Sequence, residues 1–228
     1  MPAPRMVIVG GPSGGGKSSH FSSRKIVGVT SFSTDDYCAA LNAQRLGRQN
    51  PVYVGITPEI RSRGGFELKD FIDRNIAARQ SFAFETTLHD ITFEQARRAN
   101  ANGFLVEMIF VAAGPVEEHI RRVKMRAYAG GHSASEGSLR EIYERGMRLP
   151  VTAFEENRRG SINRLAVYHN SLTTPEAEFA PPATLIVRME RGYMGGSKGA
   201  VPSWFHAAVR GTDFEIEKLR GSKSGSQS

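Results

Sequence analysis

A glycine-rich loop close to the first residue is the feature that most restricts how this chain can fold. Residues 11–18 fit the pattern of Gly, four residues, Gly, Lys, then Ser or Thr. In this pattern backbone N–H groups surround phosphate oxygens, the Lys17 ammonium reaches the β and γ phosphates, and the Ser18 hydroxyl binds Mg²⁺. The loop therefore predicts a site for a nucleoside triphosphate, which we take to be ATP. The predicted nucleotide-binding residues are Gly11, Pro12, Ser13, Gly14, Gly15, Gly16, Lys17, Ser18 and Ser19.

The residues on either side of the loop fit the same interpretation. Residues 6–9 are an apolar run suited to a buried parallel strand, and residues 17–21 are suited to a helix start. A merely flexible glycine turn would not require Lys and Ser directly after the last glycine. The segment also reads as Gly-x-Ser-x-Gly, the nucleophile elbow of serine hydrolases, but an elbow at Ser13 leaves no earlier strands and no role for Lys17.

Composition sets the class of protein. With 228 residues, of which 39% are hydrophobic, the chain predicts one domain over residues 1–220, followed by a Gly/Ser/Lys tail at 221–228. The single cysteine, Cys38, excludes an internal disulfide and favours the cytoplasm. No apolar run approaches the ~18 residues of a membrane span, and the histidines lack zinc-site spacing.

The net charge of +7 has two explanations. It suits a nucleic-acid partner, but arginines gathered around a triphosphate raise the charge in the same way. We therefore treat a nucleic-acid partner as the less favoured interpretation.

Strand and helix patterns alternate along the chain, which predicts an α/β fold with a parallel sheet covered by helices on both faces. Ligands of such folds bind at the carboxyl ends of the strands. Strands are expected at residues 25–30, 81–87, 104–112, 167–170 and 185–188. Helices are expected at residues 35–45, from Thr57-Pro58-Glu59 to Arg79 with Gly64-Gly65 as a candidate break, and at 92–100.

The sequence predicts a lid over about residues 114–150. A basic helix is expected at 114–126 and a second helix at 136–148, with a break at Gly130-Gly131-His132-Ser133 between them. Two of its arginines could close over a transferring phosphate and stabilise its charge. We expect Arg126 and Arg145 to act in this way. Most of the remaining lid arginines are expected on solvated helix faces.

Acidic residues follow two of the expected strands. Asp35 is expected to take the proton of an acceptor hydroxyl, whereas Asp36 is expected to cap or support the following helix. Glu85 and Thr86 end another strand, where a carboxylate can hold Mg²⁺ and both side chains can contact the acceptor. The alternative for Glu85 is an ordinary solvated residue at a strand end.

Five segments, taken together, resemble the zeta toxin family over about residues 5–170. They are the phosphate loop, Thr34-Asp35-Asp36, Phe82-Ala83-Phe84-Glu85-Thr86-Thr87-Leu88, Gly130-Gly131-His132 and Tyr143-Glu144-Arg145. The resemblance implies a P-loop kinase-like fold, ATP and Mg²⁺ as cofactors, and a partner antitoxin. It also implies transfer of the ATP γ-phosphate to a sugar hydroxyl of UDP-N-acetylglucosamine, with Asp35 as base, Lys17 as phosphate clamp, and Glu85 and Thr86 beside the acceptor or metal.

The leading hypothesis is therefore an ATP-dependent kinase that acts on a hydroxyl group of a small molecule. A polynucleotide kinase is an alternative within the same class. An alternative from another class is a nucleotide-dependent switch or ATPase that acts through a protein partner. An acid on the acceptor side and an arginine-bearing lid favour transfer to a second substrate over the switch.

Overall fold

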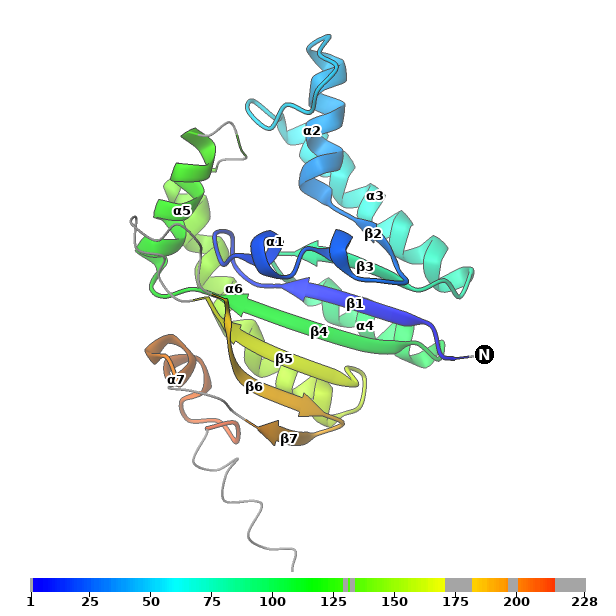
Figure 1. The fold of residues 1–228 in the computed structure, drawn as a ribbon, viewed down its shortest axis with the longest axis vertical. Helices are drawn as coiled ribbons and strands as arrows, with labels where there is room; N and C mark the ends of the chain where they lie inside the picture. The colour runs from blue at the N-terminus through cyan, green and yellow to red at the C-terminus, as the bar shows by residue number, and fades with distance from the viewer. Residues whose placement is uncertain (1, 129–130, 132–133, 171–181, 197–200, 216–228) are drawn as a thin grey trace, which may run out of the picture.

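The structure is a computed structural model that describes residues 2–128, 131, 134–170, 182–196 and 201–215. In this part of the chain, seven strands form one sheet with the order β2-β3-β1-β4-β5-β6-β7, surrounded by helices (Figure 1). The strands are β1 (Arg5–Gly10), β2 (Thr30–Phe32), β3 (Phe82–Thr86), β4 (Leu105–Ala112), β5 (Arg164–His169), β6 (Thr184–Glu190) and β7 (Tyr193–Gly196). The helices are α1 (Lys17–His20), η1 (Ser23–Lys25), α2 (Thr34–Arg45), α3 (Pro58–Ala77), α4 (Asp90–Ala101), α5 (Val116–Tyr128), α6 (Glu136–Arg158) and α7 (Ser203–Val209).

The sheet and the helices around it confirm the predicted α/β class. Strands β2, β3, β1, β4 and β5 pair in parallel, whereas β6 and β7 add to the β5 edge in antiparallel fashion. Arg191 and Gly192 join β6 to β7 with φ values of 48° and 83°. Two consecutive left-handed residues suit the tight hairpin that antiparallel neighbours require.

Helices cover both faces of the central strands. In β1, Met6 and Ile8 belong to the main core cluster, yet the alternate residues Val7 and Val9 are also buried. A strand buried on both faces needs the near-continuous apolar run seen in its sequence. In Figure 1, α4 and α6 lie behind the sheet and α1 lies in front of it.

Two helices stand over the carboxyl ends of the strands on one side and a third stands on the other. In Figure 1, α2 and α3 rise above β2 and β3, whereas α5 rises beside them on the β4 side. Helix α3 packs on the sheet through Phe71, whose ring contacts Phe32 of β2 and Phe82 of β3.

Two expected features at the α2–α3 side were wrong. Residues 25–29 do not form a strand, because Gly28 turns the chain at a φ of 76° and pairing with β3 begins only at Thr30. Gly64 and Gly65 do not break α3, which runs without interruption from Pro58 to Ala77 with Thr57 as its N-cap. Gly64 instead allows α3 to approach α2, because a Cβ there would lie 2.4 Å from Cys38 Sγ.

Helix α6 is longer than the pattern predicted. It continues through Pro150 to Arg158, so the proline does not end it. Gly146, one turn earlier, packs against the ring of Pro12 in the glycine-rich loop, with 3.2 Å between its ideal Cβ position and Pro12 Cγ. The sequence also gave no sign of α7, which packs against α6 through Phe205 and Phe154.

Some predictions fall on residues that are not described. Gly130, His132 and the tail at 221–228 lie outside the described residues. Within the described ones, no helix is long and apolar enough to cross a membrane.

Candidate active site

The glycine-rich loop connects β1 to α1 and needs its glycines for two reasons. Gly11, Gly14 and Gly16 have φ values of 138°, 80° and 94°, which L side chains rarely adopt. There is also no room for a side chain, because a Cβ at Gly11 would lie 2.1 Å from Val111 O and one at Gly16 would lie 2.0 Å from Asn170 Nδ2. The loop is therefore a tight backbone cradle, as phosphate binding by N–H groups requires.

Lys17 follows the cradle and turns back over it. Its Nζ donates hydrogen bonds to Gly11 O at 2.7 Å and to Pro12 O at 3.0 Å. Burial lowers the Lys17 pKa to about 8, although Glu85 and Asp35 oppose this, and Arg126 lowers it further. A partly buried ammonium beside the loop is placed to meet a phosphate anion.

Ser18 and Glu85 supply paired oxygens for a metal ion. Ser18 Oγ donates a 2.6 Å hydrogen bond to Glu85 Oε2, and Glu85 Oε1 accepts a 3.3 Å bond from the backbone N–H of Ser23. The described residues contain no group of three or more His, Cys, Asp or Glu side chains that could hold a metal. Mg²⁺ commonly takes one or two protein oxygens together with substrate phosphates, so this pair fits that ion.

A strained turn after β3 fixes the direction of Glu85 and Thr86. Leu88 is fully buried with a φ of 63°, and its N–H donates a 3.0 Å bond to Thr86 Oγ1. Its side chain fills the space over Gly10, where a Cβ would lie 2.7 Å from Leu88 Cδ2. The turn thus holds the end of β3 against the end of β1, where the phosphate loop starts.

The two acids at the start of α2 differ in their surroundings. Ser33 is the N-cap, so neither Asp35 nor Asp36 caps this helix. Asp36 supports the site instead, since its carboxylate pairs with Arg24 and accepts a 2.6 Å hydrogen bond from the Tyr53 hydroxyl. That hydrogen bond raises the pKa of Tyr53 to about 12.

Asp35 faces the cavity and is exposed. Its carboxylate makes no hydrogen bond or ion pair to another described residue, and its charge raises the pKa of Lys17. An acid that has no partner in the described part of the chain and lies beside the phosphate loop suits contact with a second substrate.

These residues surround one cavity of about 1440 Å³. It receives side chains from the glycine-rich loop, α2, α3, the end of β3 and α5. Arg126 lines it, whereas Arg145 does not; Arg145 is exposed on α6 and its charge acts on His89, which does line the cavity. The predicted site residues that line it are Ser13, Gly14, Gly16, Lys17, Ser18, Ser19, Asp35, Glu85, Thr86 and Arg126.

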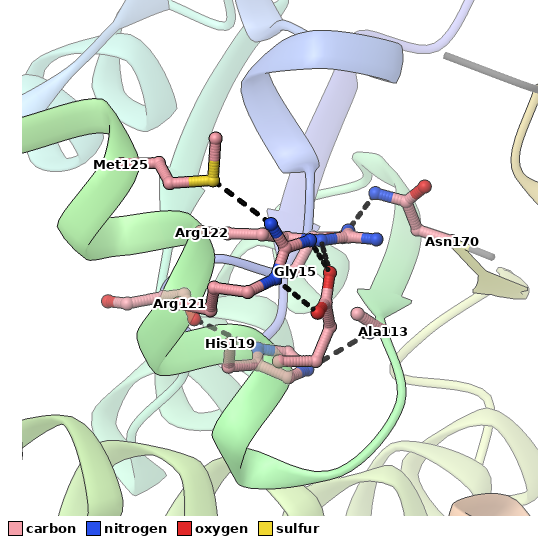
Figure 2. Close-up of polar contacts among 9 residues, drawn as sticks. Gly15, Ala113, His119, Arg121, Arg122, Met125 and Asn170 are labelled. Atoms are coloured by element: carbon pink, nitrogen blue, oxygen red, sulfur yellow. Dashed lines mark hydrogen bonds and ion pairs between the residues drawn. The ribbon is translucent and has the colours of Figure 1, made fainter. Parts of the chain in front are cut away.

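Helix α5 contributes arginines that the sequence reasoning did not single out. Arg121 and Arg122 line the cavity, and both bond the carboxylate of Glu118, which is 8% exposed (Figure 2). The Arg122 side chain is only 15% exposed, so it is the more firmly held of the two. The available signal was Glu118, placed three and four residues before the two arginines on one helix face.

Asn170 is a second residue that the sequence reasoning missed. It is buried at the end of β5, and its Nδ2 donates a 3.1 Å hydrogen bond to Gly15 O (Figure 2). The side chain therefore fastens the glycine-rich loop to the sheet. Nothing in the sequence connects a lone Asn to a loop more than 150 positions away.

No protein-family model matches the sequence, and neither does any curated protein. Solved structures do share the fold. The native complex of AvrRxo1-ORF1 with ORF2 has a TM-score of 0.65 and 12% identity, covering 96% of this chain and 70% of that one. The same complex with sulphate ions has a TM-score of 0.64 and 12% identity. The match covers 86% of this chain but only 61% of the other chain.

A third similar structure comes from the PezAT chromosomal toxin-antitoxin system of Streptococcus pneumoniae. It has a TM-score of 0.50 and 12% identity, covering 98% of this chain and 86% of that chain. At these identities the likeness establishes the fold alone.

Proposed function

We propose that this protein is an ATP-dependent phosphotransferase that moves the γ-phosphate to a hydroxyl group of a small molecule. The observation that carries the proposal is the placement of Asp35. Its carboxylate lies in the same cavity as the phosphate loop, near Lys17, and has no hydrogen-bond or ion-pair partner among the described residues. A switch that only hydrolyses nucleotide has no need for an acid on the acceptor side.

Each residue then has a part in the transfer. The loop amides and Lys17 bind the phosphates, and Arg122 and Arg126 offer positive charge from the α5 side of the cavity. Asp35 orients the acceptor hydroxyl and receives its proton as the oxygen attacks. Mg²⁺ bound at Ser18 and Glu85 would neutralise charge on the triphosphate.

The acceptor that we favour is a nucleotide-sugar of the UDP-N-acetylglucosamine type. The support is the resemblance of the sequence motifs to zeta toxins, together with the fold shared with a structure from a toxin-antitoxin system. Thr86 fits an acceptor contact, because Thr86 lines the cavity and, among the described residues, its hydroxyl accepts a bond only from the N–H of Leu88.

We also propose that a second protein acts on this one, as an antitoxin would. Two of the similar structures are a complex of AvrRxo1-ORF1 with ORF2 and a structure from a toxin-antitoxin system. One structure of the AvrRxo1 complex was solved with ATP, which is consistent with nucleotide binding by this fold.

The test is incubation of the purified protein with γ-labelled ATP, Mg²⁺ and a panel of nucleotide-sugars and oligonucleotides. Label on a nucleotide-sugar supports the proposal in full, and label on an oligonucleotide end identifies a polynucleotide kinase instead. Label found only in free phosphate contradicts a phosphotransferase. Lys17→Ala is the control, since loss of the ammonium should remove both binding and transfer.

A further inference from the structure

His119 has no place in the transfer chemistry, yet it is one of the most buried polar residues of the described chain, at 2% exposure. It lies in the first turn of α5. Its Nδ1 lies 2.9 Å from Ser13 O in the glycine-rich loop, and its Nε2 lies 3.1 Å from the backbone N of Ala113, just after β4 (Figure 2). The ring therefore connects the phosphate loop, the sheet and α5.

The two partners fix where the ring carries its proton. A carbonyl oxygen only accepts, so Nδ1 must carry the hydrogen that it donates to Ser13 O. A backbone N–H only donates, so Nε2 must be bare to accept from Ala113. Both ring nitrogens are therefore engaged in hydrogen bonds and the ring is neutral. His119 is thus excluded as a general acid or base, and its role is to hold neighbouring segments in place.

The surroundings of the ring allow little movement. The Tyr143 ring of α6 packs edge-on against it at 5.0 Å, and the Tyr143 hydroxyl donates to Gly114 O at 3.3 Å. The loop lies against the backbone of the same turn, because a Cβ at Gly14 would lie 2.4 Å from His119 O.

The residue before His119 organises the arginines of the same helix. Glu118 bonds both Arg121 and Arg122, which line the cavity. One helical turn thus holds the phosphate loop through His119 and two cavity arginines through Glu118. If the loop shifts relative to α5, the loop amides and these guanidinium groups can no longer bind the same ligand together.

We propose that His119 is a positioning residue that fixes the phosphate loop relative to α5, so that loop amides and α5 arginines bind one triphosphate together. The inference rests on the proposed nucleotide site. It predicts that the hydrogen bond to Ser13 O matters more for nucleotide affinity than the bond from Ala113, because only the first holds the loop.

Three variants separate these contacts. His119→Phe keeps the ring beside Tyr143 and loses both hydrogen bonds. His119→Asn places an amide N–H near the position of Nδ1 and can restore the bond to Ser13 O, whereas His119→Gln places its amide near Nε2 and can restore only the bond from Ala113. His206→Phe, at an exposed position of α7, is the matched control.

Two measurements apply to all four variants: ATP affinity by calorimetry with Mg²⁺, and hydrogen exchange of the amides of residues 11–18 without nucleotide. We expect His119→Phe and His119→Gln to weaken ATP binding by about tenfold and to speed exchange in the loop. We expect His119→Asn and His206→Phe to stay within about twofold of the wild type in both.

Equal ATP affinity and equal loop exchange in His119→Phe and wild type would overturn the proposal, as would equal loss in His119→Asn and His119→Gln. If His119→Phe does not fold, the Asn and Gln pair decides. If the wild type binds no ATP, the proposed function fails, whereas loop exchange that rises in Phe and Gln and recovers in Asn still supports the role of His119.

Discussion

Ser18 and Glu85, separated by 67 positions in the chain, meet through a 2.6 Å hydrogen bond between the serine hydroxyl and the carboxylate. The contact joins the start of α1 to the end of β3. It brings together the two residues that the sequence predicted as metal ligands, each from a different motif. The distance makes them a pair that one small cation can contact.

Glu85→Gln tests this pair because it keeps an acceptor oxygen for Ser18 and removes the negative charge. We expect the Mg²⁺ concentration for half-maximal activity to rise by about tenfold. The measurement is a Mg²⁺ titration at fixed ATP. Glu94→Gln, an exposed carboxylate on α4, is the control and should change nothing. An unchanged Mg²⁺ requirement in Glu85→Gln would remove Glu85 from the metal site.

Asp35→Asn should separate nucleotide binding from transfer. The amide cannot take the acceptor proton, so we expect the transfer rate to fall by about 10² to 10⁴ while ATP affinity changes by less than about twofold. Single-turnover transfer and ATP calorimetry on the same protein give both values. Transfer at the wild-type rate would show that Asp35 is not the base.

Asp36→Asn is the natural comparison, since the Asp36 carboxylate also lines the cavity but is already paired with Arg24 and Tyr53. We expect a smaller loss of rate than in Asp35→Asn, because the loss comes through displaced neighbours. A larger loss in Asp36→Asn would reverse the assignment of the two acids.

The two acids also show what sequence patterns can and cannot resolve. The pattern placed both residues at a strand-to-helix junction and assigned Asp35 to the chemistry and Asp36 to capping or support. The structure adds Ser33 as the cap and gives Asp36 the partners Arg24 and Tyr53. Ser, Asp and Asn are about equally favoured as helix caps, so the sequence alone could not choose among them.

The roles of the arginines were harder to predict from the sequence than those of the glycines. The glycine-rich loop follows a local pattern that fixes its own backbone, so it could be read directly from residues 11–18. The role of an arginine on α5 depends on which helix face meets the cavity and on whether a carboxylate holds it. Arg122 is nearly buried beside Glu118, whereas Arg145 is exposed outside the cavity lining. That difference arises from packing between distant segments and leaves no local signature.

His119 predicts a pH dependence of stability. Burial lowers its pKa to about 4, with Lys17 and Arg122 acting in the same direction and Glu118 and the bond to Ser13 opposing. The unfolded chain binds a proton near pH 6.5, so the stability that neutral His119 contributes is present above pH 6.5 and is lost as pH falls toward 4.

The measurement is urea unfolding of wild type and His119→Asn between pH 7.5 and 4.5. Because Asn does not titrate, the difference in unfolding free energy between the two proteins isolates this side chain. We expect the wild type to lose about 2 kcal/mol relative to the variant across that range. A difference that does not change with pH would mean that His119 titrates alike in the folded and unfolded chains.

Gly64 and Gly65 are adjacent in α3, but we expect replacement by alanine to change stability in opposite directions at the two positions. A Cβ at Gly64 meets Cys38 Sγ at 2.4 Å and Thr34 Cγ2 at 3.0 Å, so Gly64→Ala must push α3 away from α2. A Cβ at Gly65 meets nothing within 4 Å, and alanine favours a helix over glycine by about 1 kcal/mol. We therefore expect Gly64→Ala to lower the melting temperature and Gly65→Ala to raise it.

Because α2 carries Asp35, Gly64→Ala should also slow transfer, whereas Cys38→Ala in the same chain should recover part of both losses. Destabilisation by both single variants, or by neither, would contradict the close contact of α2 and α3 at Gly64.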